Sequence, residues 1–107
     1  MDYSEIFKTD SEGDVALDEA VRIKEPKKFG VIFLNDDYTT ADFVVQVLEK
    51  YFHKSKAEAT ELMQSVHVKG SALVGIYAYD IAQTLVSLTI GSARKNGYPL
   101  MCKLQEM

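Results

Sequence analysis

The sequence predicts an α+β fold in which three helices pack on a small, mainly antiparallel, three-stranded sheet, with a flexible N-terminal tail in front. Two observations predict it. Segments rich in β-branched and aromatic residues alternate with segments whose apolar residues recur at helical spacing, in the order β-α-α-β-α-β. The length of 107 residues suits one domain and leaves no room for a second full domain.

Residues 1–27 form the predicted acidic, flexible extension. They hold eight acidic and four basic residues, whereas residues 28–107 hold eight of each, so the formal net charge of −4 lies entirely on the extension. Its apolar residues are too sparse to offset the entropy of ordering, although a short helix over 15–23 is compatible with them. Pro26 marks the boundary to the predicted folded core, residues 28–107.

The first strand is predicted over residues 29–34, which are β-branched, aromatic and apolar, and the turn-forming residues 35–37 follow it. A helix is expected to begin at Thr39 or Thr40, because residues 39–42 fit a capping box.

Ser55 is predicted to begin the second helix, since residues 55–58 again fit a capping box, and Gly70 is its expected C-cap. The second strand is expected over residues 73–77.

The third helix is predicted to begin near Asp80, with Gln83 three residues further on. Its apolar stripe runs from Ile81 to Ala93, and the turn at residues 96–99 ends it. Residues 100–104 form the last predicted strand.

Composition and motifs argue against several classes of protein. The excess of acids argues against a nucleic-acid binder, no apolar run approaches the ~20 residues that a membrane-spanning helix needs, and no signal peptide is visible. We therefore expect a cytoplasmic protein. The sequence holds no glycine-rich phosphate loop and no CxxC, HExxH or GxSxG motif. Cys102, the single cysteine, is expected to be buried in the last strand, and His53 to be a solvated residue at a helix end.

The unusual polar cluster is Asn35-Asp36-Asp37 at a strand end, together with His67 on the second helix. Adjacent carboxylates on a turn often serve only as an Asx turn and a cap, and a lone histidine is often a satisfied, half-buried residue. A divalent metal site is a weaker alternative. A third interpretation fits the residue types better, because amide, carboxylate and imidazole acceptors that converge on one point would bind the three donors of a primary ammonium group.

Three blocks of the sequence resemble the ClpS family, the adaptor of the bacterial ATP-dependent Clp protease. They are FLNDDYTTADFV at 33–44, LMQSVH at 62–67 and GYPLMC at 97–102, in matching order and spacing. The resemblance covers about residues 28–107 and implies a binding function, not an enzyme, with no cofactor. ClpS proteins recognise N-degron substrates by their first residue, following the N-end rule, and deliver them to a ClpA-type or ClpC-type AAA+ unfoldase for degradation by ClpP.

The resemblance also implies the site residues. Asn35, Asp36 and His67 would hold the α-ammonium group of the substrate, with Asp37 as a supporting residue of the motif. The first side chain, usually Leu, Phe, Tyr or Trp, would enter a hydrophobic pocket. The residues matching that pocket are Thr39, Ala41, Val44, Met63, Val66 and Leu100. Helical spacing alone would favour a core position for several of them.

Two positions depart from the family pattern. The family usually has methionine where Ala41 stands, and the smaller side chain leaves room for β-branched Ile or Val in the pocket. The third helix usually opens with an acid and carries a lysine five residues on, both of which touch the N-terminal domain of the unfoldase. Here these positions are Asp80 and Leu85, and an apolar residue cannot form that ion pair.

Two other interpretations remain open from the residues alone. One is a protein-interaction module related to the C-terminal domain of the ribosomal stalk protein, which would not need the acceptor cluster. The other is a metal-dependent enzyme that uses Asp36, Asp37 and His67.

Overall fold

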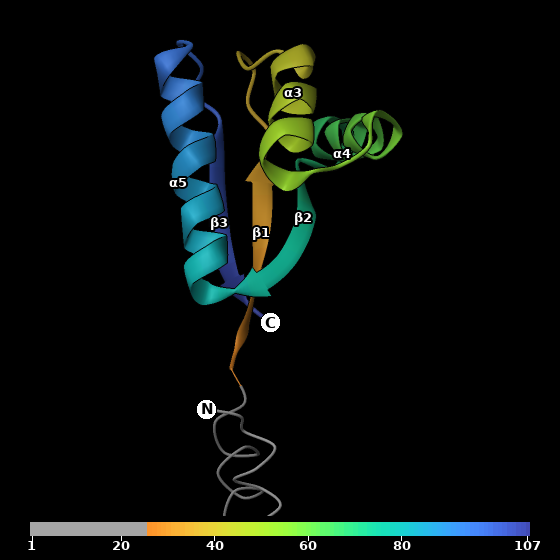
Figure 1. Cartoon of the computed structure of the whole chain (residues 1–107). Helices are drawn as coiled ribbons and strands as arrows, with labels where there is room; N and C mark the ends of the chain where they lie inside the picture. Colours follow the sequence, from red (N-terminus) through yellow and green to blue (C-terminus); the bar gives the residue numbers. More distant parts are fainter. Residues whose placement is uncertain (1–25) are drawn as a thin grey trace, which may run out of the picture.

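The computed structural model describes residues 26–107. The predicted extension and the short helix over 15–23 therefore lie outside the described residues, apart from Pro26 and Lys27, and both stay predictions. The elements follow the predicted order β-α-α-β-α-β (Figure 1). They are β1 (Lys28–Leu34), α3 (Ala41–Phe52), α4 (Lys56–Lys69), β2 (Ser71–Ala78), α5 (Tyr79–Lys95) and β3 (Met101–Glu106).

The sheet has the order β2-β1-β3, and both pairings are antiparallel, as predicted. The strand β1 is the central strand and pairs with a neighbour on each edge. Its residue Phe33 lies opposite Ala72 of β2 and Cys102 of β3. The helices α3 and α5 lie on the same face of the sheet, and α4 lies beside α3 (Figure 1). This arrangement confirms the predicted α+β architecture.

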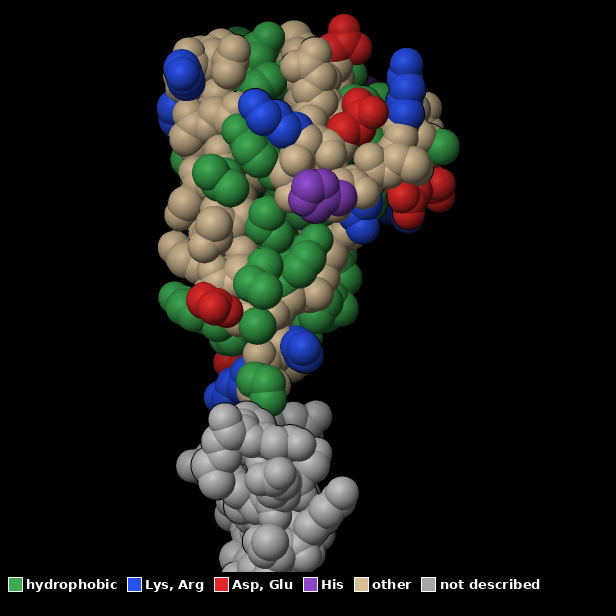
Figure 2. Space-filling model, in the orientation of Figure 1, with side chains coloured by type: hydrophobic (Ala, Val, Ile, Leu, Met, Phe, Trp, Pro, Cys, Tyr) green, Lys and Arg blue, Asp and Glu red, His purple; other side chains and the backbone are tan. Residues whose placement is uncertain are grey.

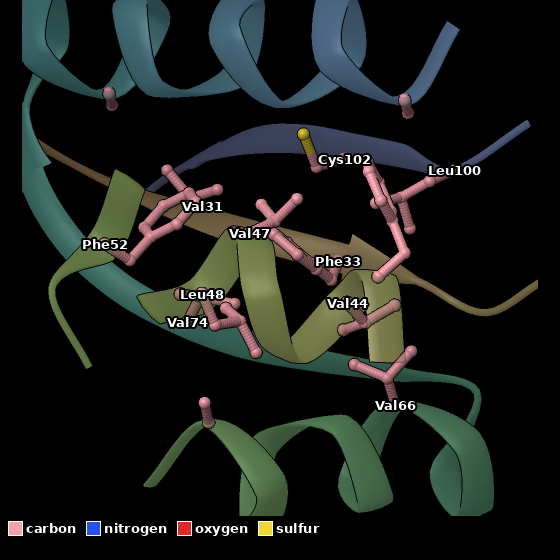
Figure 3. Packing of buried hydrophobic residues seen from close by; sticks show 14 residues of the cluster. Val31, Phe33, Val44, Val47, Leu48, Phe52, Val66, Val74, Leu100 and Cys102 are labelled. Carbon is pink, nitrogen blue, oxygen red and sulfur yellow. The ribbon is translucent and has the colours of Figure 1, made fainter. Parts of the chain in front are cut away.

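The core lies between the sheet and the helices (Figure 3). Its largest fully buried apolar side chains are Phe33, Leu48, Leu100 and Val31. The rings of Phe33 and Phe52 meet edge to face at 5.5 Å, an arrangement that stabilises aromatic pairs beyond their buried area. Each such side chain contributes about 1.5–3 kcal/mol by leaving water.

Local signals located the ends of α4 correctly. The Ser55 hydroxyl accepts from the Glu58 N–H, and the Glu58 carboxylate accepts from the Ser55 N–H, both at 3.1 Å, which completes the predicted capping box. Gly70 ends the helix in a left-handed conformation with φ of 89°, which glycine adopts at little cost.

The structure defines the starts of the other two helices more closely than the sequence did. Thr40, not Thr39, caps α3, and its hydroxyl accepts from the Phe43 N–H at 3.2 Å. The predicted box between Thr39 and Asp42 does not form, because the Thr39 hydroxyl donates to the carboxylate of Asp36 instead.

The helix α5 begins at Tyr79, one residue before the predicted start at Asp80. It begins directly after β2, and Ala78 at its N-cap has no side-chain hydrogen bond, so the expected cap from Asp80 and Gln83 was wrong. Ile81, expected on the buried stripe, is 52% exposed. The last strand begins after Leu100, which the structure buries in the core.

Candidate functional site

A cavity of about 330 Å³ lies where the end of β1, the start of α3 and the second half of α4 meet. One wall carries polar groups and the other is mainly apolar. Its lining residues are Asn35, Asp36, Asp37, Thr39, Ala41, Val44, Met63, Val66 and His67. These are nine of the ten site residues that the family resemblance implied, with Asp37 counted as the supporting residue of the motif. The tenth, Leu100, is absent from the lining because it lies in the core with 1% exposure.

One backbone hydrogen bond brings the two halves of the polar wall together. The N–H of Asn35 donates to the carbonyl of Gly70 at 2.9 Å, which ties the end of β1 to the end of α4. His67 lies three residues before Gly70, so its imidazole lies at the same cavity as the side chains that follow β1. The contact joins residues 35 positions apart, and no local sequence pattern reports it.

Asp36 shapes the turn before α3. Its Oδ1 accepts from the N–H groups of Tyr38 and Thr39 at 2.8 and 2.7 Å, and its Oδ2 accepts from the Thr39 hydroxyl at 2.7 Å. The Asx turn, one of the alternatives that the sequence left open, is therefore present. It is also compatible with ligand binding, because each carboxylate oxygen has two acceptor positions and Oδ2 uses only one of them.

The same contacts set the charge of Asp36. Partial burial raises the pKa of this carboxyl, but the hydrogen bonds from Thr39 and Tyr38 and the attraction of the Arg94 guanidinium together outweigh it. The pKa of Asp36 consequently lies below its ordinary value of 3.8. At neutral pH the polar wall holds a fixed negative charge.

The helix α4 places His67 and Val66 in different surroundings. Consecutive helical residues are rotated by about 100°, so Val66 is buried while its neighbour His67 is exposed. The alternative of a half-buried histidine is therefore wrong. An exposed imidazole at the cavity rim is free to accept a hydrogen bond from a ligand when neutral.

The apolar wall comes from α3 and α4. The side chains of Val44 and Val66 point toward one another between these helices (Figure 3), and both are largely buried. Both belong to the core and both line the cavity. A core position and a place in the pocket wall are therefore compatible for these residues. Ala41 is the first residue of α3 and is exposed, and its single methyl group leaves that side of the cavity wide.

Metal binding and cysteine chemistry receive no support from the geometry of residues 26–107. Within that range, no group of three His, Cys, Asp or Glu side chains is placed so that it could hold a metal ion. Asp36, Asp37 and His67 therefore do not form such a group. Cys102 is buried, as predicted, and burial raises the pKa of its thiol to about 11 despite the attraction of Arg94. A protonated, shielded thiol is a poor nucleophile. His53 is exposed and ends α3 in a left-handed conformation.

The two predicted docking residues lie away from the cavity. Asp80 is exposed in the first turn of α5, whereas Leu85 is half-buried and packs against the core.

Charged side chains of both signs are scattered over the visible face of the molecule (Figure 2). No helix among the described residues is long and apolar enough to cross a membrane.

Arg94 helps to lower the pKa of Asp36 and also holds a neighbouring segment, and neither role was predicted from the sequence. Its Nη1 donates to the carbonyls of Tyr98 and Leu100 at 2.8 and 2.9 Å, which holds the segment before β3 against the end of α5. An exposed arginine near a helix end usually indicates only a favourable dipole interaction. Only the tertiary contacts reveal its role.

Comparison with known proteins identifies the family. The family model described as ATP-dependent Clp protease adaptor protein ClpS matches residues 24–103. The chain belongs to the ClpS family. It is 43% identical over 97 residues to the ATP-dependent Clp protease adapter protein ClpS of Ruegeria pomeroyi, covering 91% of this chain and 86% of the relative. It is 48% identical over 86 residues to that of Syntrophus aciditrophicus, covering 80% of each chain.

A solved structure shares the fold of this ClpS-family chain. It is Agrobacterium tumefaciens ClpS2 bound to L-phenylalaninamide, with 35% sequence identity and a TM-score of 0.76. The similarity covers 78% of this chain and all of that one. The ligand of that protein is an amino acid amide, which has a free amino group and a large apolar side chain.

Proposed function

We propose that this ClpS-family adaptor binds the free N-terminal residue of a substrate protein in the cavity between β1, α3 and α4. The observation that carries the proposal is the union of a fixed carboxylate, Asp36, with an apolar wall in one cavity. A ligand that has a cation beside a large apolar group matches both halves. The amino acid amide bound to the Agrobacterium relative has this chemistry.

The polar wall suits an ammonium group. A primary ammonium has three donors and no acceptor. The Asn35 amide oxygen, the free acceptor position on Asp36 and a neutral imidazole of His67 supply three acceptors on the same cavity. Asp37 is exposed at the rim and adds negative charge without replacing any of the three.

The apolar wall suits a large first side chain. Burying a Leu or Phe side chain contributes about 1.5–3 kcal/mol, and an ammonium group held by a partly buried carboxylate contributes a similar amount. Together with peptide backbone contacts, an affinity in the micromolar range, near −8 kcal/mol, is a reasonable expectation. Because Ala41 leaves the cavity wide, we expect β-branched Ile and Val to enter as well as Leu, Phe, Tyr and Trp. Leu100 belongs to the same buried cluster as Val44 and Val66, and its carbonyl accepts from Arg94, so we expect it to stabilise the core beside the site.

A titration with peptides that differ only at their N-terminus tests the proposal. The peptides begin with Leu, Phe, Ile or acetyl-Leu. We expect the first three to bind and the acetylated peptide to fail, because acetylation removes the positive charge and two donors. Equal binding of the acetylated and free peptides would refute it. Binding of a protein partner that survives Ala at Asp36 and His67 would instead favour the stalk-like interaction module.

We further propose that the protein is an adaptor without catalytic activity of its own, acting in the cytoplasm on a Clp AAA+ unfoldase of the ClpA or ClpC type. The exposed Asp80 would contact the N-terminal domain of the unfoldase, whereas the half-buried Leu85 would stabilise α5 more than it contacts a partner. The acidic residues 1–27 would act at the unfoldase during hand-off. Removing residues 1–25 should leave peptide binding unchanged and slow the degradation of an N-degron reporter. Equal degradation rates would contradict this role.

A further inference from the structure

A second hollow lies next to the first cavity. It has a volume of about 560 Å³ and is lined by Tyr38, Arg94, Gly97, Tyr98 and Pro99. Tyr38 precedes Thr39, which lines the first cavity, and consecutive Cα atoms are about 3.8 Å apart. The two hollows therefore share the turn that Asp36 holds. A peptide leaving the first cavity could reach the second within a few residues.

The walls of this hollow are held in place. The Tyr98 ring packs against Phe43 with 4.8 Å between ring centroids, and the Thr40 hydroxyl donates to the Tyr98 hydroxyl at 3.4 Å. On the other side, Arg94 donates to the carbonyl of Tyr98. The backbone N–H of Tyr38 donates to Asp36. The hollow is thus attached to both α3 and α5.

The chemistry of the lining defines what it would bind. Two tyrosine rings and a proline ring offer apolar faces, and the Tyr38 side chain is 78% exposed, a large exposed fraction for an aromatic residue. Arg94 donates from Nη1 to two carbonyls and from Nη2 to the Met101 sulfur. A guanidinium has five N–H donors, so two remain that could bind a peptide carbonyl.

We propose that this hollow is a second subsite, which receives an apolar, preferably aromatic, side chain from the second to fourth residue of a bound substrate. The proposal rests on the proposed binding of the first residue in the neighbouring cavity. Continuity with that cavity across one turn argues for the same peptide as occupant. The arginine at one edge suits the carbonyl groups of that peptide.

The experiment compares ligands that reach one or both hollows. L-Phenylalaninamide reaches only the first cavity. Amidated pentapeptides of phenylalanine followed by alanines extend beyond it, and three versions carry a second phenylalanine at position two, three or four. We expect one of these three to bind about tenfold more tightly than the alanine peptide, since aromatic contacts of this kind are worth about one factor of ten.

The variant Tyr38→Ala should abolish that gain while leaving the affinity for L-phenylalaninamide unchanged. Its matched control is Tyr79→Ala, an exposed tyrosine at the opposite end of α5, which should preserve the gain. The proposal is overturned if no position gives a gain, or if the gain survives Tyr38→Ala. If wild-type protein fails to bind L-phenylalaninamide, the proposed function itself fails, and the second subsite fails with it.

Discussion

Replacing Asp36 by asparagine removes the negative charge of the cavity while keeping the shape of the side chain. The amide oxygen can still accept from the N–H groups of Tyr38 and Thr39, which now lie at 2.8 and 2.7 Å. The amide NH₂ can donate to the Thr39 hydroxyl, which at present donates to Oδ2. The turn should therefore survive, so the variant tests charge and not folding.

The expected loss follows from the position of the carboxylate. Truncating one partner of a buried, hydrogen-bonded charge pair costs about 2–5 kcal/mol. Asp36 is only partly buried and solvent screens its charge, which favours the lower end, about 2 kcal/mol. This loss corresponds to a Kd raised about 30-fold.

Fluorescence anisotropy with a labelled peptide that begins with leucine measures this loss. Asp42→Asn is the matched control, because Asp42 is exposed in the first turn of α3 and does not line the cavity. The control should bind as wild type does. An Asp36→Asn variant that binds within about threefold of wild type would show that charge at this position does not hold the ligand.

The same variant tests the link between Asp36 and stability. The pKa of Asp36 is lower in the folded protein than its ordinary value of 3.8, so its stabilising contribution is complete above about pH 4. That contribution is lost as the pH falls through the folded pKa. In urea denaturation, wild type should therefore lose more unfolding free energy than Asp36→Asn when the pH is lowered below about 4. Parallel losses would contradict the assignment.

Four further substitutions test the width of the cavity and the packing of the core. Ala41→Met should narrow the cavity and weaken binding of a peptide beginning with Ile by about tenfold relative to Leu, measured by titration; an unchanged ratio would count against the role of Ala41. Thr89 is fully buried and its hydroxyl has no partner among the described residues, so Thr89→Val should raise the free energy of unfolding by about 1 kcal/mol in chemical denaturation, and a decrease would refute this. At Gly75 a Cβ would collide with the Tyr77 ring, so Gly75→Ala should lower the free energy of unfolding by about 1–3 kcal/mol. Gly91 lies in open space on α5, so Gly91→Ala should raise the free energy of unfolding by about 0.5–1 kcal/mol. Thermal unfolding measures both changes, and equal effects of the two substitutions would contradict the packing.

Local sequence was sufficient to predict the ends of a helix where one short segment contains all the groups that interact. The box between Ser55 and Glu58 and the left-handed Gly70 involve neighbours within a few residues, and both were predicted correctly. For α3 the sequence offered both Thr39 and Thr40 as starts. The fold selected Thr40, because the Thr39 hydroxyl donates to Asp36. Ile81 fits a helical stripe, but periodicity alone cannot show how wide the buried face is.

The sequence by itself determined the order of elements, the mainly antiparallel α+β class and the set of residues that resembles the ClpS site. Tertiary structure decided that Asn35 and His67 share a cavity, through the hydrogen bond from Asn35 to Gly70. It also decided that Leu100 lies in the core instead of lining the cavity, and that Arg94 holds its segment. The physical reason is that capping and turn formation are local, whereas a cavity exists only where packed segments distant in the chain leave space between them.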